Sequence, residues 1–259
     1  MRILVIGDVI GRPGRRVVKL LVPSLRQELG LDLVVANGEN AAGGKGLTPE
    51  TAEELLASGV DVITSGNHIW EHKEIVPYLE GPRPVLRPLN YPTSVPGRGY
   101  IVLERAMIVN LLGRTFVGSF DCPFQTIDRL LASHKNGPAV VIVDFHAEAT
   151  SEKVAMGWYL DGRASAVLGT HTHVGTVDWR LLPQGTAYVS DIGMTGPVDS
   201  VIGVEVEAVL QRFLTSLPVR LPVGKGRVAF QAMLVEVDEA TGRAKAISRI
   251  HQEIPAGEG

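Results

Sequence analysis

The sequence of 259 residues predicts an α/β fold built on a parallel β-sheet, and two observations lead to this class. Three short apolar runs, at residues 2–7, 31–36 and 60–64, alternate with segments of helical character, which is the pattern of βαβ units. The first run is a continuous stretch rich in β-branched residues, as expected for a strand that is covered on both faces. No segment between the predicted elements has the composition of a linker, so we expect a single domain over residues 1–259.

The first predicted helix spans residues 15–29 and ends at Gly30, after a turn formed by residues 12–14. Pro23 lies inside this helix and is expected to bend or break it. Thr48 is suited to cap the next helix, which runs to about residue 58, because a proline follows it at the first helical position.

The second half of the sequence continues to alternate and closes with two long antiparallel strands. Residues 81–99 carry many prolines and are expected to be irregular. Either Thr150 or Ser151 can cap the helix before the last parallel strand. The expected elements are a β-hairpin at 99–103 and 106–112, helices at 123–132, 152–160 and 205–214, and strands at 139–145, 166–169, 176–181, 187–190, 227–238 and 244–254.

Composition narrows the range of functions. Hydrophobic residues make up 45% and charged residues 20%, as in ordinary globular proteins. The net charge of −3 predicts no general attraction to nucleic acid or membranes, so it gives no support for RNA regulation. Cys122 is the only cysteine, which excludes an internal disulfide and a cysteine-rich zinc site. No signal peptide and no apolar run of about 20 residues is evident, and we expect a cytoplasmic protein.

Polar residues of the types that bind metal ions follow five of the predicted strands. Functional groups in α/β sheets gather at the carboxyl ends of the strands, so we expect these side chains to converge. Two histidines separated by one residue at a strand end can direct both imidazoles to one point. The candidate metal ligands are Asp8, Glu39, Asn40, Asn67, His146, His171 and His173.

Each candidate has a simpler interpretation when it is considered alone. Asp8 can shape the turn before a helix, Asn40 can lie in a solvated loop, and His146 can be a hydrogen-bonded core residue. The pair His171 and His173 is harder to explain, because two adjacent buried imidazoles need two separate partners. Taken together, the oxygen and nitrogen ligands suit two cations better than one, and they suit iron, manganese or zinc rather than calcium.

His68 follows a candidate ligand and can serve as an acid, because the pKa of histidine lies near neutrality. Pairs of metal ions catalyse the hydrolysis of phosphate esters and of some amides. The residues alone therefore leave open a phosphodiesterase, a phosphomonoesterase, another dinuclear hydrolase and a metal-binding regulatory protein. A fold without metals is the remaining interpretation.

Five motifs contain the candidate residues, in the order Gly7-Asp8, Gly38-Glu39-Asn40, Gly66-Asn67-His68, His146 and Gly169-Thr170-His171-Thr172-His173. The order of these motifs resembles that of the calcineurin-like metallophosphoesterases. Three positions depart from the common pattern of that family. Ile10 stands where a histidine is usual, Glu39 replaces an aspartate, and Thr170 is an extra residue before His171.

A narrower bacterial group, the YmdB-like phosphodiesterases, shares these three departures. Residues 144–153 and 190–197 also resemble the signature sequences of that group. The resemblance implies a four-layer αββα sandwich with two mixed β-sheets flanked by helices. It also implies a small phosphodiester or nucleotide substrate, notably a 2′,3′-cyclic nucleotide, and two iron or manganese ions, with zinc as an alternative. A homo-oligomer is compatible with the sequence. We further expect residues 190–197 to border the substrate pocket.

The resemblance also implies a role for each candidate residue. Glu39 would bridge the two metals, a hydroxide between them would attack phosphorus, and His68 would protonate the leaving oxygen. One metal would bind Asp8, Glu39, Asn40 and His173, and the other would bind Glu39, Asn67, His146 and His171.

Overall fold

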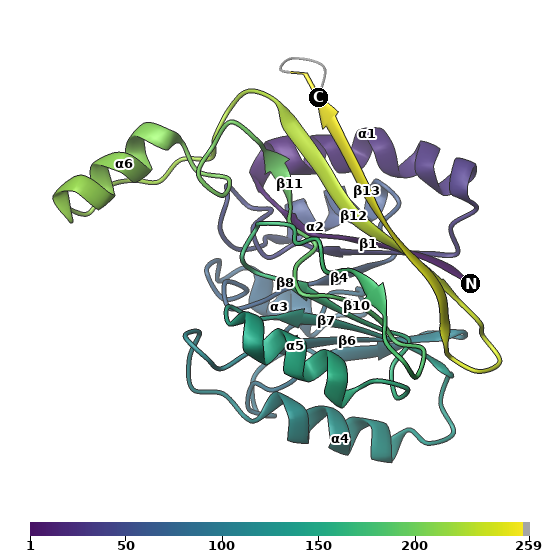
Figure 1. Cartoon of the computed structure of the whole chain (residues 1–259). Helices are drawn as coiled ribbons and strands as arrows, with labels where there is room; N and C mark the ends of the chain where they lie inside the picture. Colours follow the sequence, from purple (N-terminus) through teal and green to yellow (C-terminus); the bar gives the residue numbers. More distant parts are fainter. Residues whose placement is uncertain (256–259) are drawn as a thin grey trace.

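Two β-sheets pack face to face between outer layers of helices in the computed structural model, which describes residues 1–255 (Figure 1). This arrangement confirms the α/β class and the four layers that the resemblance implied. The single domain expected over residues 1–259 includes residues 256–259, which lie outside the described part of the chain. None of the helices within residues 1–255 is long and apolar enough to cross a bilayer.

The first sheet is mixed. Its parallel centre, β1, β3 and β4, comes from the predicted βαβαβ segment, whereas β12 runs antiparallel to β1 and pairs with the long β13. The strand order is β2 (Asp8–Val9), β11 (Met194–Pro197), β12 (Val228–Val237), β1 (Arg2–Ile6), β3 (Leu33–Asn37) and β4 (Val62–Thr64), with β13 (Ala244–Ile254) also paired to β12.

The second sheet is formed by the middle of the chain. Four of its strands are parallel, and the predicted hairpin adds an antiparallel strand at one edge. The strand order is β5 (Tyr100–Val102), β6 (Ala106–Leu112), β7 (Val140–His146), β8 (Ala166–Thr170), β10 (Ala187–Val189) and β9 (Arg180–Leu181).

Helices α1 (Gly11–Leu29) and α2 (Pro49–Ala57) pack on the first sheet, and α4 (Pro123–Ser133) and α5 (Thr150–Tyr159) pack on the second. The short α3 (Ile75–Leu79) follows β4. Helix α6 (Val206–Thr215) projects away from the body of the protein, as Figure 1 shows.

Strand β1 shows why the predicted strands are apolar throughout. Successive side chains of a strand point to opposite faces of the sheet. Leu4 and Ile6 accordingly contact the helices, whereas Ile3 and Val5 contact the second sheet. Both faces of β1 are buried from Ile3 to Ile6, so each of these positions favours an apolar residue.

Several boundaries differ from the predictions. Helix α1 begins at Gly11, so residues 12–14 belong to its first turn, and Pro23 lies inside it without ending it. The N-cap of α5 is Ala149, which has no side-chain cap, so the capping role expected of Thr150 or Ser151 was wrong. The strand expected at 176–181 is only the two residues of β9. By contrast, the cap formed by Thr48 is confirmed.

Candidate metal centre

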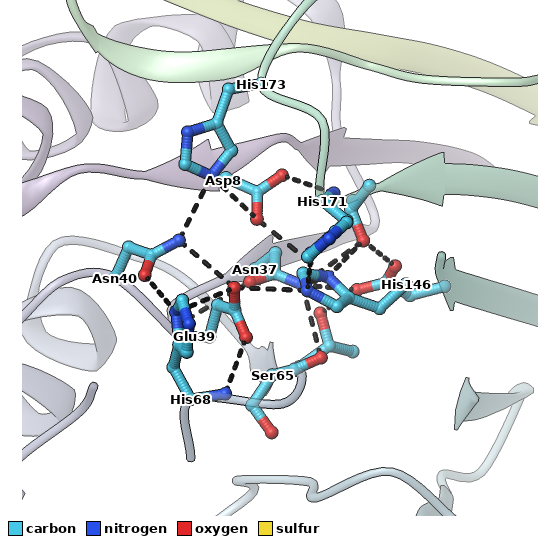
Figure 2. A network of polar contacts seen from close by, with 12 residues as sticks. Asp8, Asn37, Glu39, Asn40, Ser65, His68, His146, His171 and His173 are labelled. Atoms are coloured by element: carbon cyan, nitrogen blue, oxygen red, sulfur yellow. Dashed lines mark hydrogen bonds and ion pairs between the residues drawn. The ribbon is translucent and has the colours of Figure 1, made fainter. Parts of the chain in front are cut away.

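The carboxyl ends of strands from both sheets meet at one place and bring the candidate residues together (Figure 2). Asp8 begins β2 directly after β1, and the loop after β3 carries Glu39 and Asn40. The second sheet supplies His146 at the end of β7, and the pair of histidines follows β8. The convergence expected from the sequence is therefore observed.

Two groups of three ionisable residues can each surround a cation. Glu39, His146 and His171 form one group, and Asp8, Glu39 and His173 form the other, with the ligand atoms of each group within 4.8 Å of one another. Glu39 belongs to both groups and is fully buried. A carboxylate shared in this way is suited to lie between two metal ions.

Two buried oxygen atoms in this region lack a hydrogen-bond partner, namely Asp8 Oδ1 and Asn67 Oδ1. Asp8 Oδ2 accepts from the backbone N–H of His171 at 3.1 Å, whereas Oδ1 lies 3.8 Å from His173 Nε2. A buried polar atom without a partner costs about 1–3 kcal/mol. Cations would satisfy both oxygens, so the residues present fit a metal centre.

The hydrogen bonds around His146 leave its Nε2 available to a metal. The Thr170 hydroxyl donates to Asp144 Oδ1 at 2.6 Å, so its oxygen accepts from His146 Nδ1–H at 2.9 Å. Nε2 then faces Glu39 Oε1 at 3.1 Å and His171 Nδ1 at 3.0 Å. A metal-binding histidine usually has its other nitrogen held by an acceptor in this way.

The other two histidines show the same arrangement. His171 Nε2 lies 3.0 Å from Glu148 Oε2, which leaves Nδ1 toward the centre. His173 Nδ1–H donates to the carbonyl oxygen of Ile202 at 2.8 Å, which leaves Nε2 toward the centre. Burial, together with the neighbouring His146, lowers the pKa of His171 to about 3, so its ring is neutral and offers a lone pair.

Burial and neighbouring charges shift the pKa values of the ionisable groups in the centre. Burial raises the pKa of Asp8 to about 6, although His173 and His146 oppose this shift. Burial would lower the pKa of His146, but the charge of Glu39 beside it raises that pKa to about 9. Burial also acts to raise the pKa of Glu39, but His146 and His68 keep it well below its usual range.

Asn40 and His68 contact each other at the edge of the centre. Asn40 Oδ1 accepts from His68 Nδ1–H at 3.0 Å, while Asn40 Nδ2 lies 3.1 Å from both Glu39 Oε1 and His173 Nε2. The amide thus presents its nitrogen, not its oxygen, to the candidate ligands. The backbone N–H of His68 donates to Glu39 Oε2 at 3.2 Å, and its ring belongs to neither group.

Close packing at Gly66 explains one glycine of the motifs. A Cβ atom there would lie 2.3 Å from both Glu39 Oε2 and His146 Nε2. Any larger residue would therefore displace ligand atoms of the centre.

The two histidines after β8 have backbone conformations that are rare for residues other than glycine. The φ angles are 100° at His171 and 66° at His173. Between them, the backbone N–H and hydroxyl of Thr172 donate to Asp191 Oδ2 at 3.1 and 2.8 Å. The buried Lys153 also donates to Asp191 Oδ2, at 2.6 Å, so a buried ion pair holds this strained loop in place.

Sequence reasoning missed these supporting residues. Asp144 had the clearest signal, since a charged residue stands inside an otherwise apolar strand only two positions before His146. Asn37 contacts Asp144 Oδ2 through Nδ2 at 3.0 Å, and no feature of the sequence around it indicated this. Lys153 lies in the segment 144–153 that carries part of the resemblance, but its charge alone is typical of an exposed helix position, so no role was assigned to it.

The expected position of residues 190–197 at the border of the pocket is not observed at the cavity beside the centre. Met194–Pro197 form the buried strand β11, and none of residues 190–197 lines the cavity beside the centre. Asp191 supports the histidine loop from behind, as described above. The segment therefore holds the centre in place and does not border the cavity.

Comparisons with known proteins identify relatives of this chain. The family described as "YmdB-like protein" matches residues 4–250. The chain is 47% identical over 254 residues to the Bacillus subtilis (strain 168) protein named 2′,3′-cyclic-nucleotide 2′-phosphodiesterase, covering 96% of both chains. It is 36% identical over 252 residues to a putative phosphatase/phosphodiesterase of Mycoplasma pneumoniae, covering 93% of this chain and 89% of that one.

Solved structures show the same fold. A hypothetical protein from Thermus thermophilus matches with a TM-score of 0.93 at 49% identity, covering 98% of this chain and all (100%) of that one. A protein described as a novel phosphatase from Mycoplasma pneumoniae also matches with a TM-score of 0.93, at 34% identity, covering 99% and 95%. The extent of these matches shows that the chain belongs to the YmdB-like protein family.

Proposed function

We propose that this chain hydrolyses phosphodiesters, and specifically 2′,3′-cyclic nucleotides, with the help of two metal ions. The chain is a phosphoric ester hydrolase. The observation that carries the proposal is the buried carboxylate of Glu39, which is shared by two groups of potential ligands. The name of the 47% identical relative supports the choice of substrate.

In this proposal each cation has nitrogen and oxygen ligands, a mixture that suits iron or manganese and also zinc. One ion would be held by Asp8, Glu39, Asn40 and His173. The other would be held by Glu39, Asn67, His146 and His171.

Ligation by Asn40 requires a partial turn of its amide that brings Oδ1 between the centre and His68 Nδ1, since a full turn would place Nδ2 against His68. An amide oxygen has two lone pairs, so it can hold a cation and still accept from His68 Nδ1–H. The unpartnered Asn67 Oδ1 is already free for the second ion.

Two bound ions would neutralise charge on the phosphoryl oxygens and lower the pKa of a water molecule, which could then lose a proton to solvent and attack phosphorus as hydroxide. His68 then donates a proton to the leaving ribose oxygen. Its Nδ1–H remains on Asn40, so Nε2–H of the imidazolium is the proton that is transferred. Burial lowers the pKa of His68 in the absence of substrate, whereas Glu39 acts against this shift, and a bound phosphate would add further negative charge.

The experiment that tests this function combines metal analysis with a competition assay. The purified protein should contain iron or manganese, and removal of metal should abolish hydrolysis that Mn²⁺ or Fe²⁺ restores. With both substrates in one tube, kcat/KM for 2′,3′-cyclic nucleotides should exceed that for nucleoside monophosphates by at least about tenfold, a difference near 1.4 kcal/mol. A ratio at or below unity would indicate a phosphomonoesterase, which the names of the Mycoplasma relatives also allow.

A further inference from the structure

A cavity of about 380 Å³ adjoins one side of the candidate metal centre. Asn40, His68 and His173 form its inner end, whereas His146 and His171 do not line it. Figure 2 shows the same division, with Asn40 and His68 on one side of the group and His146 on the other. The volume lies within the range of pockets that bind small molecules.

The walls of the cavity are mostly aliphatic side chains and glycine backbone. Ile10, Val204, Leu221 and Val223 supply the apolar surface. Gly44 has a φ of 96°, and a Cβ atom there would lie 2.7 Å from Val223, so only glycine fits that wall. Apolar walls of this kind suit the faces of a nucleobase.

Two positively charged side chains also line the cavity, and only one of them forms an ion pair within residues 1–255. Lys45 forms an ion pair with Glu71 at 2.7 Å. Arg212, which comes from α6, has no ion pair with any residue in the range 1–255. Its guanidinium therefore offers free donors to a ligand.

The chemistry of a cyclic ester fixes the side on which the nucleoside must lie. In a 2′,3′-cyclic phosphate both ester oxygens belong to one ribose, so the ribose carries the leaving oxygen. His68 is the proposed proton donor to that oxygen and lines this cavity. The nucleoside consequently extends from the centre into the space beside His68.

We propose that this cavity is the nucleoside site of the enzyme, an inference that rests on the proposed function. The base lies between the aliphatic walls, and Arg212 donates to acceptor atoms on its edge. The metal centre alone would then bind any diester, and the cavity would confer the preference for nucleotides.

Ethylene phosphate tests this proposal, because it has the same five-membered cyclic diester but no nucleoside. The variant Leu221→Trp reduces the volume of the cavity and leaves every candidate metal ligand in the sequence unchanged. It should lower kcat/KM for adenosine 2′,3′-cyclic phosphate at least about tenfold, mainly through KM, and should change kcat/KM for ethylene phosphate less than about twofold. Arg212→Ala should raise KM for the nucleotide about three- to tenfold with kcat unchanged.

Matched controls are Leu20→Trp, at an exposed position on α1, and Arg16→Ala, which lines a separate cavity. Both should behave as wild type, and metal content should be equal in all variants. Equal losses on both substrates, or no loss on either, would overturn the proposal. If the wild type hydrolyses neither substrate, the proposed function fails. Equilibrium binding of adenosine 3′-monophosphate, weakened at least about tenfold by Leu221→Trp, would still decide whether the cavity holds a nucleoside.

Discussion

Thr170 lies behind the candidate metal centre, and its hydroxyl connects the acceptor Asp144 to the imidazole of His146. The variant Thr170→Val removes this hydroxyl and nearly preserves the shape of the side chain. Asp144 retains the hydrogen bonds from Thr64 and Asn37. His146 Nδ1–H, however, loses its acceptor in a fully buried site, so the main effect falls on the histidine.

The expected magnitude follows from that single lost acceptor. A buried donor left without a partner costs about 1–3 kcal/mol, which corresponds to about 5- to 150-fold in binding. Loss of a residue that orients a metal-binding histidine typically weakens metal affinity about 10- to 100-fold. We therefore expect Thr170→Val to weaken binding at the site that contains His146 by about 10- to 100-fold.

Competition with a chelator, followed by metal analysis, measures this change directly. Thr186→Val is the matched control, because Thr186 is also fully buried and donates to a backbone carbonyl, that of Ala164, away from the centre. It should reduce thermal stability without changing metal affinity. Wild-type metal affinity in Thr170→Val would refute the idea that the Thr170 hydroxyl orients His146 for the metal.

Three further variants test other parts of the centre. Glu39→Ala should lose more metal than an alanine variant of any other proposed ligand, because it removes a ligand from both ions. Metal analysis of the purified variants gives the comparison. His68→Ala should retain both metals but lose about 10²-fold or more in turnover, with a smaller loss for nitrophenyl esters, and loss of metal would instead identify His68 as a ligand. Lys153→Met should lower the free energy of unfolding by about 3–5 kcal/mol in urea titrations, because it leaves Asp191 buried without its cation, whereas Lys19→Met, at an exposed position, should have little effect.

The sequence was informative where a local pattern has one physical cause. Strands β1, β3 and β7 are apolar because both of their faces are buried, and this is visible in the order of residues alone. Strand β11 has no such pattern. It contains glycine and proline, which are rare in strands, and its pairing with β2 and β12 depends on residues far away in the chain.

The start of α1 was missed for a similar reason. The residues Gly11-Arg12-Pro13-Gly14 have the composition of a turn. In the fold, a Cβ atom at Gly14 would lie 2.3 Å from the carbonyl oxygen of Thr195. Glycine at this position therefore allows the first turn of the helix to approach β11, a contact that no local pattern can predict.

The candidate centre shows the same limit at the level of atoms. Residue types and their order predicted which side chains converge, but they could not predict which atom each one presents. His146 presents Nε2 because Thr170 holds Nδ1, whereas His171 presents Nδ1 because Glu148 holds Nε2. These choices are made by partners that are not candidate ligands themselves, so they emerge only when the chain is folded.

Ile10 connects this centre with the cavity beside it. It occupies the position of a histidine in the wider family that the sequence resembles, yet it is 2% exposed and offers no ligand atom. Cβ atoms at Gly196 and Gly203 would lie 2.8 and 2.9 Å from its side chain, so two glycines enclose it. Its side chain lines the proposed nucleoside cavity. A polar imidazole here would interrupt the apolar wall, and isoleucine instead continues it up to the metal ligands. In the proposed function, isoleucine at this position would leave the first ion with an oxygen-richer set of ligands and would give the base an apolar surface.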